Sequence, residues 1–505
     1  MIKMNLLSIL INFSLGSSVL VYLFSGKQYT KLTHWIALLG AIASLIGGGL
    51  LFYQFDVTQQ GFQFQENWLW ITRWNIHYAL GIDGISLMLI LLTILITSLS
   101  VLTTWHRHDP SVGKYLGHIF LLQGLMIASF SATDGMLFYI CWEALLIPMT
   151  LMIGIWGSAE RAHAAIKFFL YTFLGSALML VGLLYLGNQQ TSPNFMITHF
   201  YSLPLNWSEQ LLLFSVFFLA FAVKIPLFPL HTWLPEAHTE APTEGSMILA
   251  ALMLKLGGYG VIRFCLPIFP DILKWCAPVI CALGLSAVIY ASLIACVQQD
   301  MKKLIAYSSI AHMGMMMVGI FAAFSSKNPS YSHAVLGVTG SILQMIAHGM
   351  SSAGLFLGIG ILYQRFHSRM VEHYSGLAQI MPTLATGFMI FSLSSMGLPG
   401  TAGFVGEYFI ILSAVQYNFW VGLLAASTLI LSVGYLLLLY GKLFWGILKH
   451  PPIYQDTLHL SIQEQIAMWV LVIGIFLLGI WPMLILERIQ PAVETILKLG
   501  LQSKL

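Results

Sequence analysis

The stretch that decides the fold is FAVKIPLFPLHTWLPEAHTEAPTEGSMILAALMLKLGGYGVIR, residues 221–263. It places Lys224 and Lys255 inside segments that are otherwise apolar, and the run between the two lysines carries prolines, histidines and glutamates but no Lys or Arg. A charged side chain at the centre of a bilayer costs about 2.5 to 3.5 kcal/mol even on lenient insertion scales. We therefore expect both lysines to serve a function.

The composition is that of an integral membrane protein. The 505 residues are 58% hydrophobic and 8% charged, with a mean hydropathy of +0.84, whereas an average soluble domain has about 25% charged residues. The net charge of +3 is spread along the chain, which excludes the clustered basic surface of a nucleic-acid-binding protein. The cysteines lie in or beside apolar runs without a CxxC pair, so we interpret them as small core residues and expect no iron–sulfur site: Cys141, Cys265, Cys276, Cys281 and Cys296.

Apolar windows of about 20 residues predict an all-α polytopic membrane protein, because that length spans a hydrocarbon core of about 30 Å. We count fourteen such windows. The twelfth is too long for one crossing and is interrupted at Gly397, Pro399 and Gly403, so we expect a broken helix there, and prolines interrupt the seventh as well. The expected limits are 4–24, 34–55, 82–104, 116–132, 134–157, 164–187, 211–230, 243–266, 275–297, 303–323, 334–363, 381–418, 419–447 and 465–487.

Basic residues fall mainly in the odd-numbered connections, which the positive-inside rule places in the cytoplasm or matrix. Both termini are then expected on the other side. The longest connection on that side, 56–81, alternates polar and apolar residues around Gly61, which predicts a short hairpin. The basic residues of the odd connections are Lys27, Lys31, Arg107, Lys114, Arg161, Lys167, Lys302, Lys303, Arg365, Arg369, Lys442 and Lys449, whereas Arg263 is among the few assigned to even ones.

The layout of charges and breaks indicates an internal repeat. Lys224 precedes the prolines of the seventh segment, and Glu407 follows the break of the twelfth, five segments later. A displacement by an odd number of spans inverts the orientation, so two inverted five-helix repeats are expected. The predicted division is 1–115 (helices 1–3 and the hairpin-like loop), 116–266 (first repeat), 267–447 (second repeat) and 448–505 (helix 14 and tail).

Four full charges are expected well inside spans: Glu143, Lys224, Lys255 and Glu407. Desolvation favours the neutral form of a lysine, and a nearby carboxylate favours the charged form. A Glu/Lys pair of adjustable separation can therefore hold and release a proton, and we predict such a pair between Glu143 and Lys224. The alternative is a static ion pair that fixes two helices.

Histidines and prolines extend this line of titratable groups. His312 and His348 lie in spans among Ser, Gly and Met, which favours a proton relay over a packed core imidazole. For His231, near the interface and beside Trp233, packing is favoured over relay, although we keep it as a candidate. Pro226 cannot donate to the carbonyl of Ala222, which predicts an open, hydrated backbone next to the lysine, or a kink that serves packing.

The acidic stretch between the lysines has two interpretations. Glu236, Glu240, Glu244 and His238 could form a proton-collecting mouth, or they could be a polar loop with Glu244 near a helix N-terminus, where the dipole favours an anion. The sequence shows no glycine-rich phosphate loop and no flavin or dinucleotide fingerprint, so we expect no cofactor in this chain.

Several stretches resemble the antiporter-like proton-pumping subunits of respiratory complex I. Within this family they are most similar to the chain M type of bacterial NADH:quinone oxidoreductase and to mitochondrial subunit 4, and a glutamate in the twelfth helix is also M-like. The resemblance covers nearly the whole chain. The stretches are AVKIPLFPLH (222–231), HTWLPEAHTEAPTEGSMILAALMLKLGGYG (231–260), YALGIDGISL (78–87), IAYSSIAHMG (305–314) and SSMGLPGTAGFVGE (394–407).

This resemblance implies a hydrophilic axis across the membrane plane. It assigns Glu143 to the fifth helix, Lys224 to the broken seventh, Lys255 to the eighth and Glu407 to the broken twelfth, with His312 and His348 as relay positions. It implies that NADH, FMN, iron–sulfur clusters and quinone are held by partner subunits, that antiporter-like chains L and N flank this one, and that the chain lies in a bacterial inner membrane with both termini periplasmic.

Three other functions remain open at this stage. The homologous chain of a multisubunit cation/proton antiporter or of a membrane-bound hydrogenase shares the same motifs. A passive spacer of the membrane arm would need no titratable line, and an independent small-solute transporter would need a pocket chemistry that the sequence does not show.

Overall fold

The computed structural model describes residues 5–107, 111–190, 192–325, 331–448 and 459–505. Lys449, assigned above to a connection, lies outside the described residues. The main elements in chain order are α1 Leu6–Leu23, α2 Thr30–Gln54, β1 Gln63–Ile71, β2 Ile76–Ile82, α3 Gly84–Thr103, α4 Val112–Ser131, α5 Gly135–Ala144, α6 Leu146–Trp156, α7 Arg161–Gly187, α8 Ile197–Ser202, α9 Trp207–Lys224, α10 Trp233–Glu240, α11 Thr243–Ile248, α12 Leu254–Gly260, α13 Leu266–Ile268, α14 Pro270–Val297, α15 Met301–Ala322, α16 Tyr331–Phe366, α17 Pro382–Ser395, α18 Ala402–Tyr417, α19 Phe419–Phe444, α20 Ile462–Ile480 and α21 Met483–Leu501.

The described helices confirm an all-α polytopic membrane protein. Twelve of them are long and apolar enough to cross a membrane, where α5 with α6 and α11 to α13 each count as one span. The other two predicted spans are helical as well: 116–132 falls in α4, and 381–418 is divided into α17 and α18. Both predicted breaks are present, since α9 ends at Lys224 before α10, and residues 396–401 separate α17 from α18. A total of fourteen crossings and the inverted repeats stay predictions.

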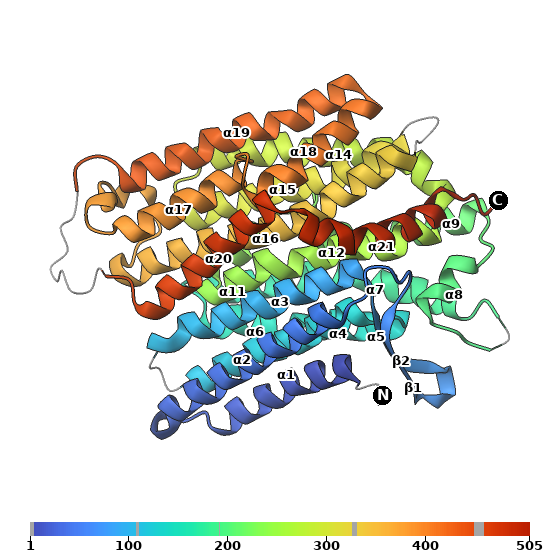
Figure 1. Ribbon diagram of the computed structural model, residues 1–505, viewed down its shortest axis with the longest axis horizontal. Coiled ribbons are helices and arrows are strands. Elements are labelled where there is room, and N and C mark those ends of the chain that lie inside the picture. The colour runs from blue at the N-terminus through green and yellow to red at the C-terminus, as the bar shows by residue number, and fades with distance from the viewer. Residues whose placement is uncertain (1–4, 108–110, 191, 326–330, 449–458) are drawn as a thin grey trace.

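The helices run side by side along one direction (Figure 1), and the hairpin and the described ends of the chain lie toward the same end of the bundle. We call this end the hairpin face and the other end the opposite face. The most apolar 18-residue windows of the span Thr243–Ile268 and of helix α16 are entirely buried within the bundle. Because α15, α17, α18, α20 and α3 pack around α16, side chains on these central helices meet far from the lipid.

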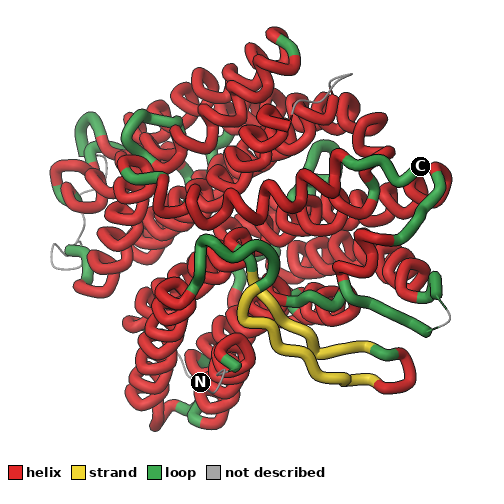
Figure 2. The backbone as a smooth tube through the Cα atoms, turned by 45° about the vertical axis from the view of Figure 1, so that its right-hand side comes forward, coloured by secondary structure: helices red, strands yellow, loops and turns green. Residues whose placement is uncertain are grey.

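The predicted hairpin is confirmed. Strands β1 and β2 pair antiparallel, with Trp68 opposite Tyr78, and the pair projects from the bundle (Figure 2). Its Glu66 carboxylate is buried and accepts hydrogen bonds from the backbone amides of Leu7 and Ser8 at 3.1 and 3.3 Å. Four free amides at a helix N-terminus favour an anion. The hairpin therefore anchors the start of α1.

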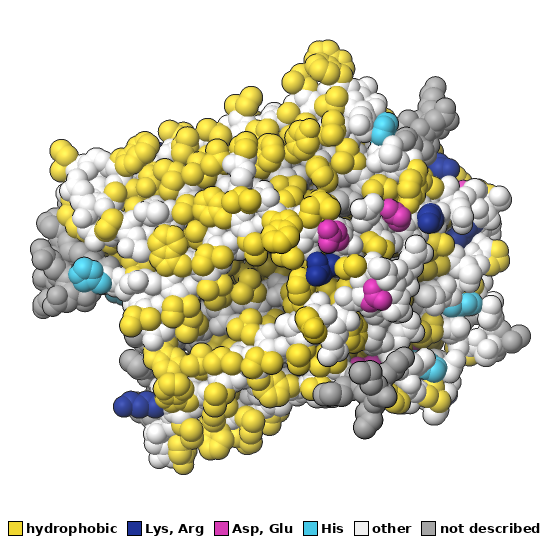
Figure 3. All heavy atoms as spheres, in the orientation of Figure 1, with side chains coloured by type: hydrophobic (Ala, Val, Ile, Leu, Met, Phe, Trp, Pro, Cys, Tyr) yellow, Lys and Arg dark blue, Asp and Glu magenta, His cyan; other side chains and the backbone are white. Residues whose placement is uncertain are grey.

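A helix near the C-terminus was missed by the sequence analysis. The predicted span 465–487 is wrong at its end, because α20 stops at Ile480 and a turn at Trp481 and Pro482 starts α21. The buried side chains of α21 recur every three or four residues, which is typical of an amphipathic helix, and α21 packs on α3, α13 and α16. Most of the outer surface in Figure 3 is apolar, and its few charged side chains lie mainly toward the hairpin face and α21.

Candidate functional site

Lys255 lies at the centre of the bundle, between two π-helical segments. The segments Leu249–Met253 and Val261–Cys265 flank the short helix α12 that carries it. Its side chain is completely buried, and its Nζ donates to the carbonyl of Ala250 at 2.6 Å and lies 2.7 Å from Nδ1 of His348. π-Helical turns often occur at functional sites. Lys255 is thus fully buried within the span Thr243–Ile268.

A continuous set of contacts leads from Lys255 through two histidines to Glu407. The ring of His348 on α16 lies 5.4 Å, centre to centre, from the ring of His312 on α15. Nδ1 of His312 is 3.1 Å from Oε1 of Glu407 on α18, and its Nε2 is 3.0 Å from the hydroxyl of Ser395. The amide of Gln344 donates to Glu407 at 3.1 Å. Four predicted residues from four different segments of the chain are thus brought together.

Two glycines of the broken twelfth helix shape the end of this line. Gly397 has a φ of 73°, and a Cβ there would lie 2.6 Å from Oε2 of Glu407. A Cβ on Gly403 would lie 1.9 Å from the carbonyl oxygen of Ser394. Glycine alone tolerates such a backbone and such a close approach. Oε2 of Glu407 is buried and has no hydrogen-bond partner among the described residues, so one oxygen remains able to accept a proton.

Lys224 and Glu143, the predicted pair of adjustable separation, are apart in this structure. No ion pair within 4.0 Å joins them among the described residues, and Nζ of Lys224 has no hydrogen-bond partner there. The ammonium instead lies 5.1 Å from the ring centre of Trp142 and 5.9 Å from that of Phe168, where the π faces attract a cation. Glu143 is half-buried and accepts a hydrogen bond from Ser176. The two charges interact through space only.

The backbone next to Lys224 is less open than the prolines predicted. The amide of Leu227 donates to the carbonyl of Ala222 at 2.8 Å, and the indole N–H of Trp233 donates to the carbonyl of Val223 at 2.9 Å. The expectation of an open Ala222 carbonyl is therefore wrong, because the chain turns back after α9 and supplies new donors.

His231 is packed among aromatic rings. It stacks on Phe228 with ring centres 5.6 Å apart and contacts the edge of Tyr290 at 5.4 Å. None of its described contacts is with Lys255, His348, His312 or Glu407. The packing interpretation is the one that this geometry supports.

His238 is a titratable group that the sequence analysis placed in a loop. It lies on α10, fully buried, with its ring stacked on Phe356 at 4.6 Å, and both of its ring nitrogens lack a hydrogen-bond partner among the described residues. It interacts electrostatically with Lys255 and with Lys302. The sequence did contain one indication that His238 lies on a helix. Pro235 precedes it by three residues, and a proline is favoured in the first turn of a helix.

A cavity of about 500 Å³ lies at the opposite face and is lined by the residues that follow α10, Ala241 and Pro242 among them. Glu244 and Lys302 are part of its wall. Glu244 accepts a hydrogen bond from the hydroxyl of Tyr115 at 2.8 Å, and Nζ of Lys302 donates to the carbonyl of Ala241 at 2.6 Å. Lys302, assigned above to a connection, is in fact buried in the first turn of α15. Titratable groups thus continue from the cavity to the central lysine.

The other members of the acidic stretch are used in ion pairs. Glu236 pairs with Lys167 at 2.6 Å, and Glu240 lies 3.5 Å from Arg369. Glu244 occupies the first turn of α11, as one of the two interpretations expected. A proton-collecting mouth and a helix-terminus charge are therefore both compatible with Glu244, whereas Glu236 joins α10 to α7 and Glu240 joins the end of α10 to Arg369.

Arg263 and Asp83 lie near the ends of predicted spans, and the sequence analysis did not count them among the charges well inside those spans. Arg263 was assigned to a connection, but it is buried within the second π-helical segment and pairs with Asp83 at 2.5 Å. The described residues contain no group of three His, Cys, Asp or Glu side chains arranged for a metal ion. The cysteines are free thiols, and Cys296 is exposed, so its interpretation as a core residue is wrong.

Comparison with known proteins gives the family. The family model described as "NADH:quinone oxidoreductase/Mrp antiporter, TM" matches residues 132–432. This chain belongs to that family. The chain is 41% identical over 503 residues to NADH-quinone oxidoreductase subunit M of Rhodobacter capsulatus, covering 97% of this chain and 96% of the relative. It is also 41% identical over 492 residues to NADH-ubiquinone oxidoreductase chain 4 of Chondrus crispus, covering 96% of each.

Solved structures of the NADH:quinone oxidoreductase/Mrp antiporter family share the fold. A chain of respiratory complex I from Thermus thermophilus superposes with a TM-score of 0.88 at 29% identity, covering 98% of this chain and 100% of that one. A chain of the Mrp complex from Dietzia sp. superposes with a TM-score of 0.82 at 18% identity, covering 98% of this chain and 52% of that one, and shows the fold alone. The resemblance to antiporter-like subunits of complex I, of the M type, is confirmed.

Proposed function

We propose that this chain is the M-type, proton-translocating subunit in the membrane arm of an NADH:quinone oxidoreductase. The observation that carries the proposal is the unbroken contact line from Lys255 through His348 and His312 to Glu407. Each member can bind and release a proton, and imidazole can accept on one nitrogen while it releases from the other. Partner subunits would hold NADH, FMN, the iron–sulfur clusters and quinone, and this chain would convert their energy into proton movement.

Proton uptake from the opposite face follows the cavity and His238. Glu244 and Lys302 line the cavity, and His238 lies within electrostatic reach of Lys302 on one side and Lys255 on the other. The two unpartnered nitrogens of His238 leave it able to bond a water or a proton carrier on each side. His238 is therefore added to the predicted relay residues.

Lys224 and Glu143 act as the adjustable end of the axis. The separated pair in this structure is the state in which the lysine is least stabilised as a cation, because the carboxylate is beyond contact. Closing the gap would hold a proton on Lys224, and opening it would release that proton toward Lys255. His231 is kept outside this relay because its ring packs against aromatic neighbours.

The two broken helices support the inverted-repeat division, 116–266 and 267–447. Lys224 ends α9 before one break, and Glu407 lies one turn into α18 after the other. Paired interrupted helices at corresponding places in two halves are typical of transporters built from inverted repeats.

The orientation and the partners are part of the same proposal. Arg107, Lys302, Arg365 and Arg369 gather at the opposite face, which would be cytoplasmic, and both termini would then be periplasmic. The hairpin exposes Trp68, Leu69, Trp70 and Trp74, an apolar surface suited to lipid or to the flanking chains L and N.

The test is Lys255→Ala in the assembled complex, with Lys274→Ala, an exposed lysine on α14, as the matched control. General acid–base groups contribute about 10²- to 10⁴-fold to proton transfer. We expect the share of NADH-driven proton uptake that passes through this chain to fall at least about a hundredfold for Lys255→Ala, so that fewer protons are taken up per NADH at an unchanged amount of complex on a native gel, and uptake to stay normal for Lys274→Ala. Normal pumping by Lys255→Ala would identify a passive spacer.

A second experiment separates the homologous complexes. Purification of the tagged chain in mild detergent should recover quinone-linked dehydrogenase subunits. Recovery of hydrogenase subunits or of small antiporter chains instead would contradict the assignment to complex I.

A further inference from the structure

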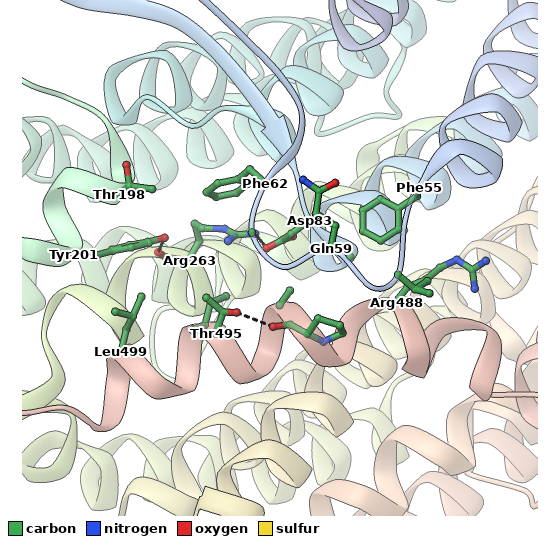
Figure 4. A pocket seen from close by; sticks show the side chains of 16 residues that line it. Phe55, Gln59, Phe62, Asp83, Thr198, Tyr201, Arg263, Arg488, Thr495 and Leu499 are labelled. Atoms are coloured by element: carbon green, nitrogen blue, oxygen red, sulfur yellow. Dashed lines mark hydrogen bonds and ion pairs between the residues drawn. The ribbon is translucent and has the colours of Figure 1, made fainter. Parts of the chain in front are cut away.

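A second buried charge pair lies on the hairpin side of Lys255. The guanidinium of Arg263 donates to Asp83 at 2.5 Å, and its Nε donates to the hydroxyl of Tyr259 at 3.3 Å. The ring of Phe62 covers the guanidinium at 5.0 Å (Figure 4). Asp83 also caps α3 by accepting from the amide of Ser86 at 3.0 Å. Both members of the pair are almost completely buried.

A cavity of about 240 Å³ reaches this pair from the hairpin face. Gln59, Gly61 and Thr198 are exposed at its rim, whereas Asp83 and Arg263 are buried at its floor. Helix α21 forms one wall (Figure 4). Arg263 follows Lys255 by eight residues, which is about 12 Å along a helix. A cavity that can hold water therefore comes within about 12 Å of the central lysine.

Arg263 bonds the polar side chain that lies between Lys255 and this cavity. Tyr259, one helical turn after Lys255, donates its proton to the carbonyl of Phe130 at 3.0 Å and accepts from Arg263. An arginine has five N–H donors, no acceptor, and does not lose its proton in proteins. The Tyr259 hydroxyl also lies 3.2 Å from that of Ser86, which itself accepts from Arg263 at 3.5 Å. The guanidinium, which cannot take up a proton, therefore bonds both hydroxyls that face the cavity side.

We propose that Arg263 is an electrostatic seal that keeps the central lysine from exchanging protons with the hairpin face. A fixed positive charge beside a pore excludes protons in other channels. The seal rests on the proposed function, and it assigns a direction: protons taken up at the opposite face can leave Lys255 only along the line toward Glu407. Asp83 holds the guanidinium in place and is a positioning residue.

The expected size of the effect follows from the distance. A unit charge that acts over about 12 Å at an effective dielectric constant of about 20 changes a rate by about tenfold. Arg263→Gln removes this charge and introduces an amide oxygen that can accept a hydrogen bond, so both parts of the seal are lost. Asp83→Asn breaks the ion pair but keeps the positive charge.

The experiment measures passive proton flux into liposomes that contain the whole complex, without NADH, under a potassium diffusion potential and with a pH-sensitive dye inside. We expect Arg263→Gln to raise the flux at least about tenfold. Asp83→Asn should stay within about twofold of the unaltered complex. The matched control is the double variant Arg365→Gln with Glu464→Gln, which removes a pair of similar burial, 2.7 Å apart, at the opposite face and should also stay sealed.

Two outcomes would overturn the seal. One is an Arg263→Gln complex that is present in the liposomes but conducts no more protons than the unaltered complex. The other is an equal leak from Asp83→Asn, which would mean that the ion pair stabilises the fold and that the charge of Arg263 has no separate role.

If Arg263→Gln does not assemble, the double variant Arg263→Gln with Asp83→Asn leaves two amides that can bond each other. It should leak as well, and a sealed double variant would refute the proposal. NADH-driven pumping by the unaltered complex in the same liposomes tests the proposed function separately from the seal.

Discussion

His348 gives the most direct test of the proton line, because it touches both Lys255 and the next histidine. His348→Asn leaves an amide oxygen that can accept the hydrogen bond of Lys255 in place of Nδ1, but an amide does not titrate near neutral pH. His348→Ala removes the hydrogen bond and the titratable group together. Comparing the two variants therefore separates two roles of His348: the hydrogen bond that positions Lys255, and the transfer of a proton from Lys255.

The magnitudes differ for the two variants. A hydrogen bond to a charged group contributes about 1.5 to 3 kcal/mol, or roughly 10- to 150-fold in an equilibrium constant. His348→Ala should lose that contribution and yield less assembled complex, whereas His348→Asn should assemble normally. Loss of the relay itself should slow proton transfer at least about a hundredfold in both.

The assay is NADH-driven proton uptake by membrane vesicles, divided by quinone reduced and by the amount of complex on a native gel. His373→Asn, an exposed histidine at the opposite face, is the control and should pump normally. A His348→Asn complex with an unchanged ratio of protons to electrons would refute the reasoning, because the line would then carry protons without its histidine.

Three further predictions concern the start of α1, the contact between α3 and α21, and the C-terminal residues. Glu66→Ala should lower the free energy of unfolding by about 1 to 2 kcal/mol, measured by thermal unfolding, because the first turn of α1 loses its anion. Gly84→Ala should destabilise by about 1 to 3 kcal/mol in the same assay, since a Cβ would lie 1.7 Å from a carbonyl oxygen of α21, whereas Gly49→Ala, with nothing within 4 Å, is the control. Burial lowers the pKa of Lys504 to about 8, against a smaller opposing effect of Asp271. The undocked segment therefore binds more protons than the docked one between pH 8 and about 10.5, so docking of the C-terminal residues should become more stable as pH rises through that range. Hydrogen exchange of these residues measures the effect, and the pH dependence should vanish in Lys504→Met.

The helices and their breaks could be predicted from the sequence because the bilayer imposes a simple rule. A run of about 20 apolar residues that crosses a bilayer is expected to be a helix, and prolines and glycines clustered inside it favour a break, although Gly47, Gly48 and Gly49 lie within the continuous helix α2. The same rule made Lys255, His312, His348 and Glu407 visible as exceptions in apolar runs. Their contacts could not be predicted, since they depend on how α12, α15, α16 and α18 pack.

The residues that sequence reasoning misplaced share a physical cause. His238, Lys302 and Arg263 lie near the ends of apolar windows, where a charge is equally compatible with a loop and with a buried helical turn. Only tertiary packing decides between the two, because a neighbouring carbonyl, aromatic ring or carboxylate can satisfy the charge inside the bundle. The separation of Glu143 and Lys224 could not be predicted for the same reason: it depends on how Trp142 and Phe168 pack against the ammonium.

The two π-helical segments around Lys255 make its position depend on chain length. An α-helix turns by about 100° per residue, and a π-helical turn accommodates an extra residue without moving the ends of the helix. Deleting one residue from Leu249–Met253 would therefore turn this segment into a regular α-helix and leave Lys255 facing His348, whereas inserting one more residue would rotate Lys255 by roughly a quarter turn away from it. Single-residue insertions in this segment should consequently be far more damaging than single-residue deletions. The spacing of the helix specifies the proton line as much as the identity of the lysine does.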